Sequence, residues 1–212
     1  MNRFLFFTFT SLCISLSSYA QKVGDNKPVF VTIAVDQILR LSINSGGNLE
    51  FVFNNMAQYQ NGINSGGVTA SYNTVFSVTS STHWDLFMGA EDATFQSTDY
   101  FSPPVGSPVG ALSLDNVGYN FTHVPGNPNA DFATPAAGFP STVQKLQVFG
   151  GASVIASSVT GNPGDASANT FTIQWRVGTK EGTMNVKSIL AQNVNPDRYI
   201  TNVILEVAKG LL

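Results

Sequence analysis

The sequence predicts an all-β protein, an antiparallel β-sandwich that follows a short export signal. Three observations predict it: apolar residues alternate with a period of two, Gly and Asn turn signals divide the apolar runs, and no stretch has the pattern of an amphipathic helix. About ten strands with short turns favour a sandwich over a parallel sheet. Because no clear linker divides the chain, we expect one sandwich domain over residues 21–212.

Residues 1–20 have the three parts of a secretory signal peptide. Arg3 gives the positive start, residues 4–16 form the apolar run, and Ser18-Tyr19-Ala20 fits a small-x-small cleavage site. The run is shorter than the roughly 20 apolar residues of a membrane span, which favours a cleaved leader over an anchor. Cys13 lies inside the run rather than at its end, which argues against lipidation. We therefore expect an exported protein of the periplasm, the cell surface or the extracellular space, with no integral membrane span.

The composition fits an exported protein and argues against nucleic acid and membrane surfaces as partners. The chain carries 10 basic and 13 acidic residues, without a basic cluster that would bind nucleic acid or an anionic membrane surface. Its one cysteine belongs to the expected leader, so a disulfide framework is excluded and stability has to come from the core. Charged residues make up 11% of the chain, well below the roughly 25% of ordinary globular proteins.

The order of apolar runs and turns predicts the strands. Turns are expected at residues 44–47, 161–164 and 180–182, where Gly and Asn allow a positive φ. Trp84 and Trp175 are in phase with apolar neighbours, which predicts that both lie in the core. The expected strands are residues 29–35, 39–43, 49–53, 74–79, 84–88, 112–121 with a bulge or turn near 115–116, 146–149, 153–159, 170–177, 184–190 and 198–207.

No motif indicates an enzyme or a bound cofactor. His83 and Asp85 share one strand face, but no nucleophile elbow accompanies them, so a solvated polar face is favoured over a hydrolase. Two distant histidines without a cysteine in the mature chain do not resemble a zinc site. Whether Glu91, Asp92 and Asp99 form a calcium site stays open, because their spacing gives only part of the usual ligand pattern. We expect no catalytic, cofactor-binding or metal-binding residue.

Aromatic rings in loops are the candidates for contact with a ligand. Carbohydrate-binding sandwiches present flat rings on one face, and a cluster of three or more exposed rings would favour that alternative function. Both tryptophans are expected in the core, so the candidates are loop residues: Tyr59, Tyr72, Tyr100, Phe101 and Phe139.

The order of these features resembles a known group of proteins. An early strand at residues 29–35 leads through residues 39–43 and 49–53 to the run that holds Trp84, and the chain closes on Pro196-Asp-Arg-Tyr-Ile-Thr-Asn-Val-Ile-Leu205. This order is similar to the secreted pilin-like or adhesin-like β-sandwiches of Gram-negative bacteria, in which a final Pro-x-x-Tyr-x-x-x-Val-x-Leu strand completes an immunoglobulin-like sheet. The chain departs from typical chaperone-assembled pilins because it lacks their disulfide.

The resemblance implies a structural or adhesive role on the cell surface. The implied partners are other surface or envelope proteins, copies of the same chain, or glycans. Residues Val29, Val31, Ile33 and Val35 are the candidates for an exchanged strand that adds to the sheet edge of a neighbour. The alternative is pairing within the chain's own sheet, which we favour from the sequence because it hides the edge without a partner.

Overall fold

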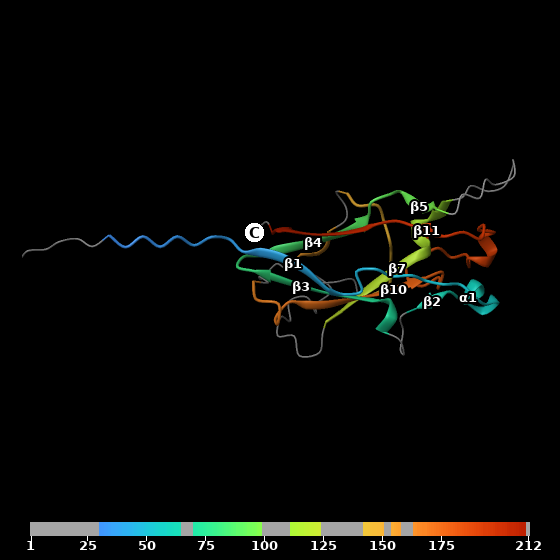
Figure 1. Ribbon diagram of the computed structural model, residues 1–212, viewed down its shortest axis with the longest axis horizontal. Coiled ribbons are helices and arrows are strands. Elements are labelled where there is room, and N and C mark those ends of the chain that lie inside the picture. Colours follow the sequence, from blue (N-terminus) through green and yellow to red (C-terminus); the bar gives the residue numbers. More distant parts are fainter. Residues whose placement is uncertain are drawn as a thin grey trace, which may run out of the picture. The chain divides into compact units, whose positions relative to one another are not determined.

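The computed structural model describes residues 30–64, 70–98, 111–123, 142–150, 154–157 and 163–210 (Figure 1). The chain divides into two compact units, Met1–Val35 and Asp36–Leu212. Residues 30–35 are the described part of the first unit, and they contain no strand. The expected leader at residues 1–20 and the Pro- and Gly-rich loop at 124–140 lie outside the described residues.

The second unit is the predicted all-β sandwich, and its strands pair antiparallel. Its elements are β1 (Leu39–Ser45), α1 (Met56–Asn61), β2 (Ile63–Asn64), η1 (Ala70–Tyr72), β3 (Asn73–Ser80), β4 (Trp84–Ala90), β5 (Thr94–Ser97), β6 (Ala111–Ser113), η2 (Leu114–Asn116), β7 (Val117–His123), β8 (Gln144–Lys145), β9 (Val154–Ser157), β10 (Thr170–Val177), η4 (Leu190–Gln192), β11 (Tyr199–Ile200) and β12 (Val203–Lys209).

Three sheets make the two layers of the sandwich. One layer is a six-stranded sheet in the order β1-β3-β10-β7-β8, with β2 pairing to β10. The other layer holds two three-stranded sheets, β12-β4-β9 and β11-β5-β6. In Figure 1 these two smaller sheets follow one another along the upper side of the molecule, because β4 continues into β5 and β11 continues into β12.

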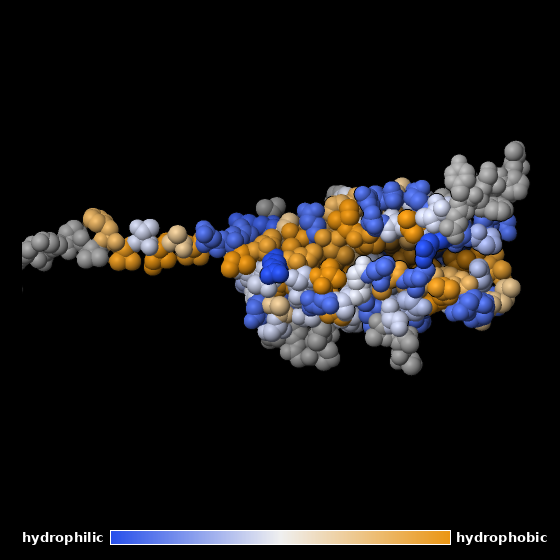
Figure 2. All heavy atoms as spheres, in the orientation of Figure 1, coloured by the Kyte–Doolittle hydropathy of each residue, from blue (hydrophilic) through white to orange (hydrophobic). Residues whose placement is uncertain are grey.

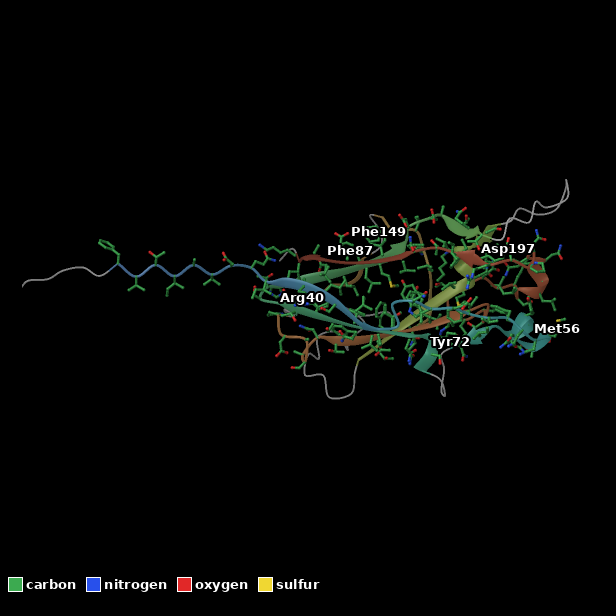
Figure 3. The ribbon with its side chains drawn as sticks, viewed as in Figure 1. Arg40, Met56, Tyr72, Phe87, Phe149 and Asp197 are labelled. Carbon is green, nitrogen blue, oxygen red and sulfur yellow. The ribbon has the colours of Figure 1, made fainter. Side chains whose placement is uncertain are left out.

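The core lies between the layers and comes from the alternating apolar residues. Trp84 and Leu86 of β4 are fully buried, and so are Phe76 of β3 and Phe171 of β10. The Trp84 and Phe171 rings meet edge to face with their centroids 6.0 Å apart. Phe87 of β4 lies on the opposite face of the strand from Trp84 and Leu86. It is partly exposed, in the same layer as Phe149 (Figure 3). The prediction that Trp84 and Trp175 belong to the core is confirmed, since they are 0% and 5% exposed.

Two of the three predicted turns are confirmed, whereas residues 161 and 162 of the third lie outside the described residues. Gly46 has a φ of +69°, and a Cβ at that position would lie 1.9 Å from the Asn73 carbonyl oxygen. Lys180 and Gly182 also have positive φ, so the predicted turn at residues 180–182 is confirmed. The slip predicted near residues 115–116 is the 3₁₀ turn η2, which separates β6 from β7.

Four strands predicted within the second unit differ from the structure. Residues 49–53 form no strand, although Leu49, Phe51 and Phe53 do face the core while the residues between them are exposed. Residues 184–190 also form no strand, because only residues 184 and 189 are buried there, and five residues apart is not a strand's spacing. The run at 198–207 divides into β11 and β12 at residues 201–202, and the run at 146–149 contributes only an isolated bridge at Val148.

The structure adds one short helix that the apolar pattern did not predict. Asn55 caps the N-terminus of helix α1, and its side-chain oxygen accepts a hydrogen bond from the Gln58 N–H at 3.0 Å. Gly62 caps the C-terminus; it has a φ of +79° and donates its N–H to the Gln58 carbonyl at 2.7 Å. None of its residues is buried, so it carries no apolar stripe for sequence reasoning to find.

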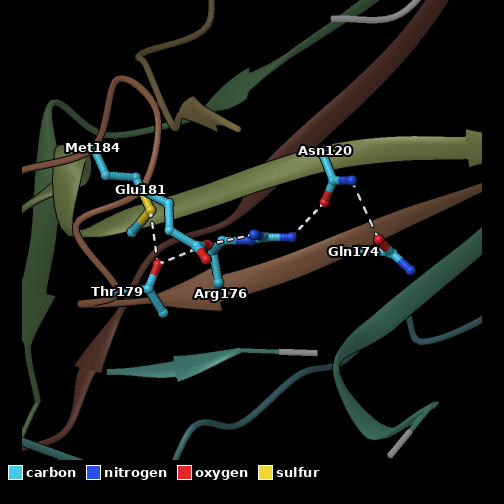
Figure 4. Close-up of polar contacts among 6 residues, drawn as sticks. All are labelled: Asn120, Gln174, Arg176, Thr179, Glu181 and Met184. Atoms are coloured by element: carbon cyan, nitrogen blue, oxygen red, sulfur yellow. Dashed lines mark hydrogen bonds and ion pairs between the residues drawn. The ribbon is translucent and has the colours of Figure 1, made fainter. Parts of the chain in front are cut away.

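A polar network fastens the end of β10 to its neighbours (Figure 4). Arg176 pairs with Glu181 of the following turn and donates to the Asn120 side chain of β7 at 2.5 Å. Asn120 in turn donates to Gln174 at 3.2 Å, and Glu181 accepts from Thr179 at 3.2 Å. These contacts pair two guanidinium nitrogens of Arg176, a residue that is 9% exposed, whereas its Nε is buried without a hydrogen-bond partner among the described residues. The contacts lie within one sheet and its turn, so we assign the network to the fold.

Burial raises the pKa of Tyr119, which lies in β7, to about 12 from an ordinary value of 10. The unfolded chain therefore loses this proton first, and the free energy of unfolding is expected to fall as the pH rises from 10 to 12, by roughly 2 to 3 kcal/mol in full. Denaturant unfolding at a series of pH values measures the effect. Tyr119→Phe removes it, and an unchanged pH dependence in that variant would contradict the assignment.

Candidate assembly surface

Residues 30–35 expose a row of large apolar side chains. Val31, Ile33 and Val35 occupy alternate positions along the segment and are 78%, 81% and 86% exposed. Phe30, which precedes Val31, is 89% exposed. The residues take part in no β-ladder among those that the structure describes. The expectation of a strand in the chain's own sheet is therefore wrong for residues 30–35, and Val29 lies outside the described residues.

Residues 37 and 38, which come just before β1, bond to the β3–β4 turn. The Ile38 N–H donates to the Ser81 hydroxyl at 2.9 Å, and the Ser81 N–H donates to the Ile38 carbonyl at 2.9 Å. The Gln37 amide donates to the Thr82 hydroxyl at 3.0 Å. Since Leu39 pairs with Ser80, the two bonds between Ile38 and Ser81 continue the β1–β3 pairing by one more residue pair.

Two strand edges lie beside each other where the sandwich layers meet. β1 ends the six-stranded sheet and β12 ends the sheet β12-β4-β9, and the two strands are neighbours without pairing. Figure 2 shows apolar side chains gathered between the layers in the part of the molecule where Figure 1 has β1. We call this strip the apolar seam. The inward apolar residues of its two strands pack on the core but are only partly buried: Leu39, Leu41, Val203, Leu205 and Val207.

Two of the candidate aromatic residues pack against rings of the chain itself. Tyr72 stacks on Phe51 with ring centroids 4.3 Å apart and an angle of 13° between the planes. Tyr59 packs on Phe53 at 5.3 Å. Both tyrosines are partly buried, so each has one ring face engaged. Tyr100, Phe101 and Phe139 lie outside the described residues.

The acidic residues singled out for calcium are only partly described. Glu91 is exposed and accepts a hydrogen bond from the Asn202 side chain at 2.7 Å, which joins the end of β4 to the start of β12. Asp92 is partly buried, and Asp99 lies outside the described residues. Across the described ranges, no three His, Cys, Asp or Glu side chains come together as a metal site.

His83 and Asp85 lie beside Gly210, near the end of the described chain. The His83 carbonyl accepts the Gly210 N–H at 2.9 Å, and a Cβ on Gly210 would lie 3.4 Å from an Asp85 carboxylate oxygen. The end of the described chain therefore covers this pair. Partial burial raises the pKa of Asp85 above its usual range. Among the described residues, Nδ1 of His83 is buried without a hydrogen-bond partner.

No protein-family model matches this chain, and no curated protein is significantly similar to it. Among the described residues, no helix is both long enough and apolar enough to cross a membrane.

Proposed function

We propose that this chain is an exported, non-enzymatic surface protein of a fimbria-like kind, structural or adhesive, that works through contacts with other copies or with envelope proteins. The observation that carries the proposal is the exposed apolar row at residues 30–35. Complete burial of each such side chain is worth about 1.5–3 kcal/mol, so the free monomer leaves a considerable stabilisation unused. Exposed apolar surface of this extent is typical of a site for a partner.

The chemistry of the segment favours strand exchange as the kind of contact. Its residues carry no charge, and its apolar side chains alternate, so one face can be buried while the other stays in water. Its backbone N–H and C=O groups take part in no ladder with the described residues, and strand addition to a partner's sheet edge would pair them. Export without disulfides also suits an assembly in which buried apolar surface, and not a covalent link, joins the subunits.

Removing the segment is the direct test. We expect a chain that lacks residues 21–34 to fold and to stay monomeric, whereas the full chain, expressed with its own leader and purified from the envelope, forms oligomers. Circular dichroism and thermal unfolding report the fold, and light scattering after size exclusion reports the mass. An unfolded deletion product would mean that the segment belongs to its own sheet, and a monomeric full chain would contradict the proposal.

The alternative, a carbohydrate-binding module, gains no support from the described aromatic residues. It needs three or more rings on one exposed face, whereas Tyr59 and Tyr72 each pack on a phenylalanine of residues 51–53. A glycan array on the purified protein distinguishes the two functions, because clear binding by the chain that lacks residues 21–34 would favour the carbohydrate-binding function.

A further inference from the structure

We propose that copies of this chain also bind side by side, with Arg40 of one copy placed on the outer face of the sheet β12-β4-β9 of the next. The inference rests on the proposed function and adds to it a second contact, which joins neighbouring fibres laterally. The receiving surface consists of Asp85, Phe87, Glu206 and Ala208, and we call it the Phe87 patch. The contact uses no residue of the segment at residues 30–35.

The Phe87 patch is a block of four neighbouring side chains on two paired strands. Phe87 of β4 lies directly opposite Glu206 of β12, and Asp85 lies opposite Ala208. The alternate residues of β4 are buried, so Asp85 and Phe87 face outward. Side chains that lie opposite each other in a sheet are about 5 Å apart. Two carboxylates therefore border one partly exposed ring, and the small side chain of Ala208 leaves room beside them.

This arrangement suits a guanidinium group, which can lie against the face of an aromatic ring while it donates hydrogen bonds to carboxylates. The Asp85 and Glu206 side chains have no ion-pair or hydrogen-bond partner in the described part of the chain. A cation beside a carboxylate lowers its pKa, whereas burial raises the pKa of Asp85. Lys209, which also belongs to β12, pairs with Trp84 and alternates to the other face. The patch therefore has an unused site for a cation.

Arg40 is the matching group, because its guanidinium is not engaged within the described part of its own chain. The structure describes three arginines. Arg176 pairs with Glu181, and Arg198 pairs with Glu50. The Arg40 side chain is exposed and makes no ion pair or hydrogen bond with the described residues. A free guanidinium on one surface of the domain thus complements a free pair of carboxylates on another.

Arg40 and the Phe87 patch cannot meet within one molecule. Leu39 and Leu41 of β1 pack on the core, so Arg40 between them faces outward from the six-stranded sheet. The patch faces outward from the other layer, and the core separates the two surfaces. The arginine that fills the patch therefore comes from a second copy. Each copy offers the arginine on one side and the patch on the other, so the contact is heterologous and continues from copy to copy.

The two groups lie near the same end of the domain (Figure 3). Arg40 pairs with Thr79 just before the end of β3, and Asp85 is the second residue of β4. Copies that lie side by side in the same direction therefore bring Arg40 of one level with the patch of the next. A single contact of this kind is weak, because exposed charges are screened by salt, but fibres that lie in register repeat it at every subunit.

Charge reversal in the full chain, expressed with its own leader and purified from the envelope, tests the contact. We expect bundled fibres at about 20 mM salt and single fibres at about 500 mM, because the screening length falls from roughly 20 Å to roughly 4 Å. At low salt, Arg40→Glu should lower the bundled fraction at least about fivefold, since it places like charges together. Adding Glu206→Lys to that variant should restore part of the bundling, because the reversed pair attracts again. Low-speed sedimentation measures the bundled fraction, and electron microscopy distinguishes bundles from single fibres.

Lys187→Glu is the matched control for net charge. Lys187 is exposed, belongs to neither surface, and its reversal changes the net charge as much as Arg40→Glu does. We expect its bundled fraction to equal that of the natural chain, and thermal unfolding shows whether each variant keeps the fold. Single fibres at low salt, or an equal loss of bundling with Lys187→Glu, would overturn the lateral contact and leave the proposed function intact. A chain that stays monomeric would overturn both.

Discussion

Ile33→Asp is expected to abolish self-association, with the dissociation constant rising at least about a hundredfold. Ile33 is 81% exposed in the free chain and lies at the centre of the apolar row, so its replacement removes no contact from the folded unit. In the assembled state the variant loses the burial of an isoleucine and gains a carboxylate that would need to lose its water. Analytical ultracentrifugation over a range of protein concentrations measures the change.

Thr32→Asp is the matched control for that experiment. It adds the same charge one residue away, on the opposite side of an extended segment, and Thr32 is also exposed in the free chain. We expect its dissociation constant to stay within a few-fold of the natural chain's, because surface charges contribute little in ordinary salt. Equal effects of the two substitutions would mean that net charge, and not the apolar row, controls assembly.

Trp84→Ala is expected to cost about 3–5 kcal/mol of the free energy of unfolding. Trp84 is fully buried at the start of β4 and packs on Phe171 of the opposite layer, so its loss leaves a cavity that both layers border. A domain of ordinary stability has about 5–15 kcal/mol, and no disulfide is available here to offset the loss. Denaturant unfolding followed by circular dichroism gives the value.

Phe87→Ala removes an aromatic ring from the same strand but from its other face. Phe87 is partly exposed (Figure 3), and we expect this variant to lose about 1 kcal/mol. The comparison tests the period-two arrangement of β4. Equal losses for the two variants would mean that the strand buries both faces, contrary to the alternation in the structure.

The alternation of apolar residues predicted the sandwich strands well where a partner strand lay close. The strand predicted at 170–177 has those bounds as β10, and β3 and β4 extend their predictions by one or two residues at an end. β10 lies between β3 and β7, and its buried residues Phe171, Ile173 and Trp175 follow the predicted spacing. The sequence was informative here because the position of a residue on a strand decides whether water or the core surrounds it.

The same pattern could not predict which extended segments find a ladder partner. Residues 49–53 alternate in burial as a strand does, with Phe51 facing inward and Glu50 outward, yet they pair with no strand in the described part of the chain. Residues 30–35 alternate equally well and are exposed on both sides. Alternation reports which side chains prefer the core, whereas a ladder depends on neighbours that are distant in the sequence.

Only one of the two parts of the candidate site, the apolar row, could be predicted from the sequence. The apolar row at Val31, Ile33 and Val35 is visible in the sequence as a possible exchanged strand. The seam is not, because it depends on β1 and β12 ending two different sheets beside each other, and the sequence separates these strands by more than 150 residues. The partial burial of Tyr59 and Tyr72 was equally beyond sequence reasoning, since their ring partners come from a segment expected to be a strand.

The hydrogen bonds that align Ile38 with the β1–β3 ladder also determine how the domain would respond to mechanical force. In a chain of subunits joined through residues 30–35, tension would reach the domain at the beginning of β1 and act along the axis of that strand. The ladder hydrogen bonds from Leu39 to Ser45 would then share the load and resist shear together, and would not open one by one. A fibre joined in this way would withstand pulling through its most extensively paired strands, without any covalent bond between subunits.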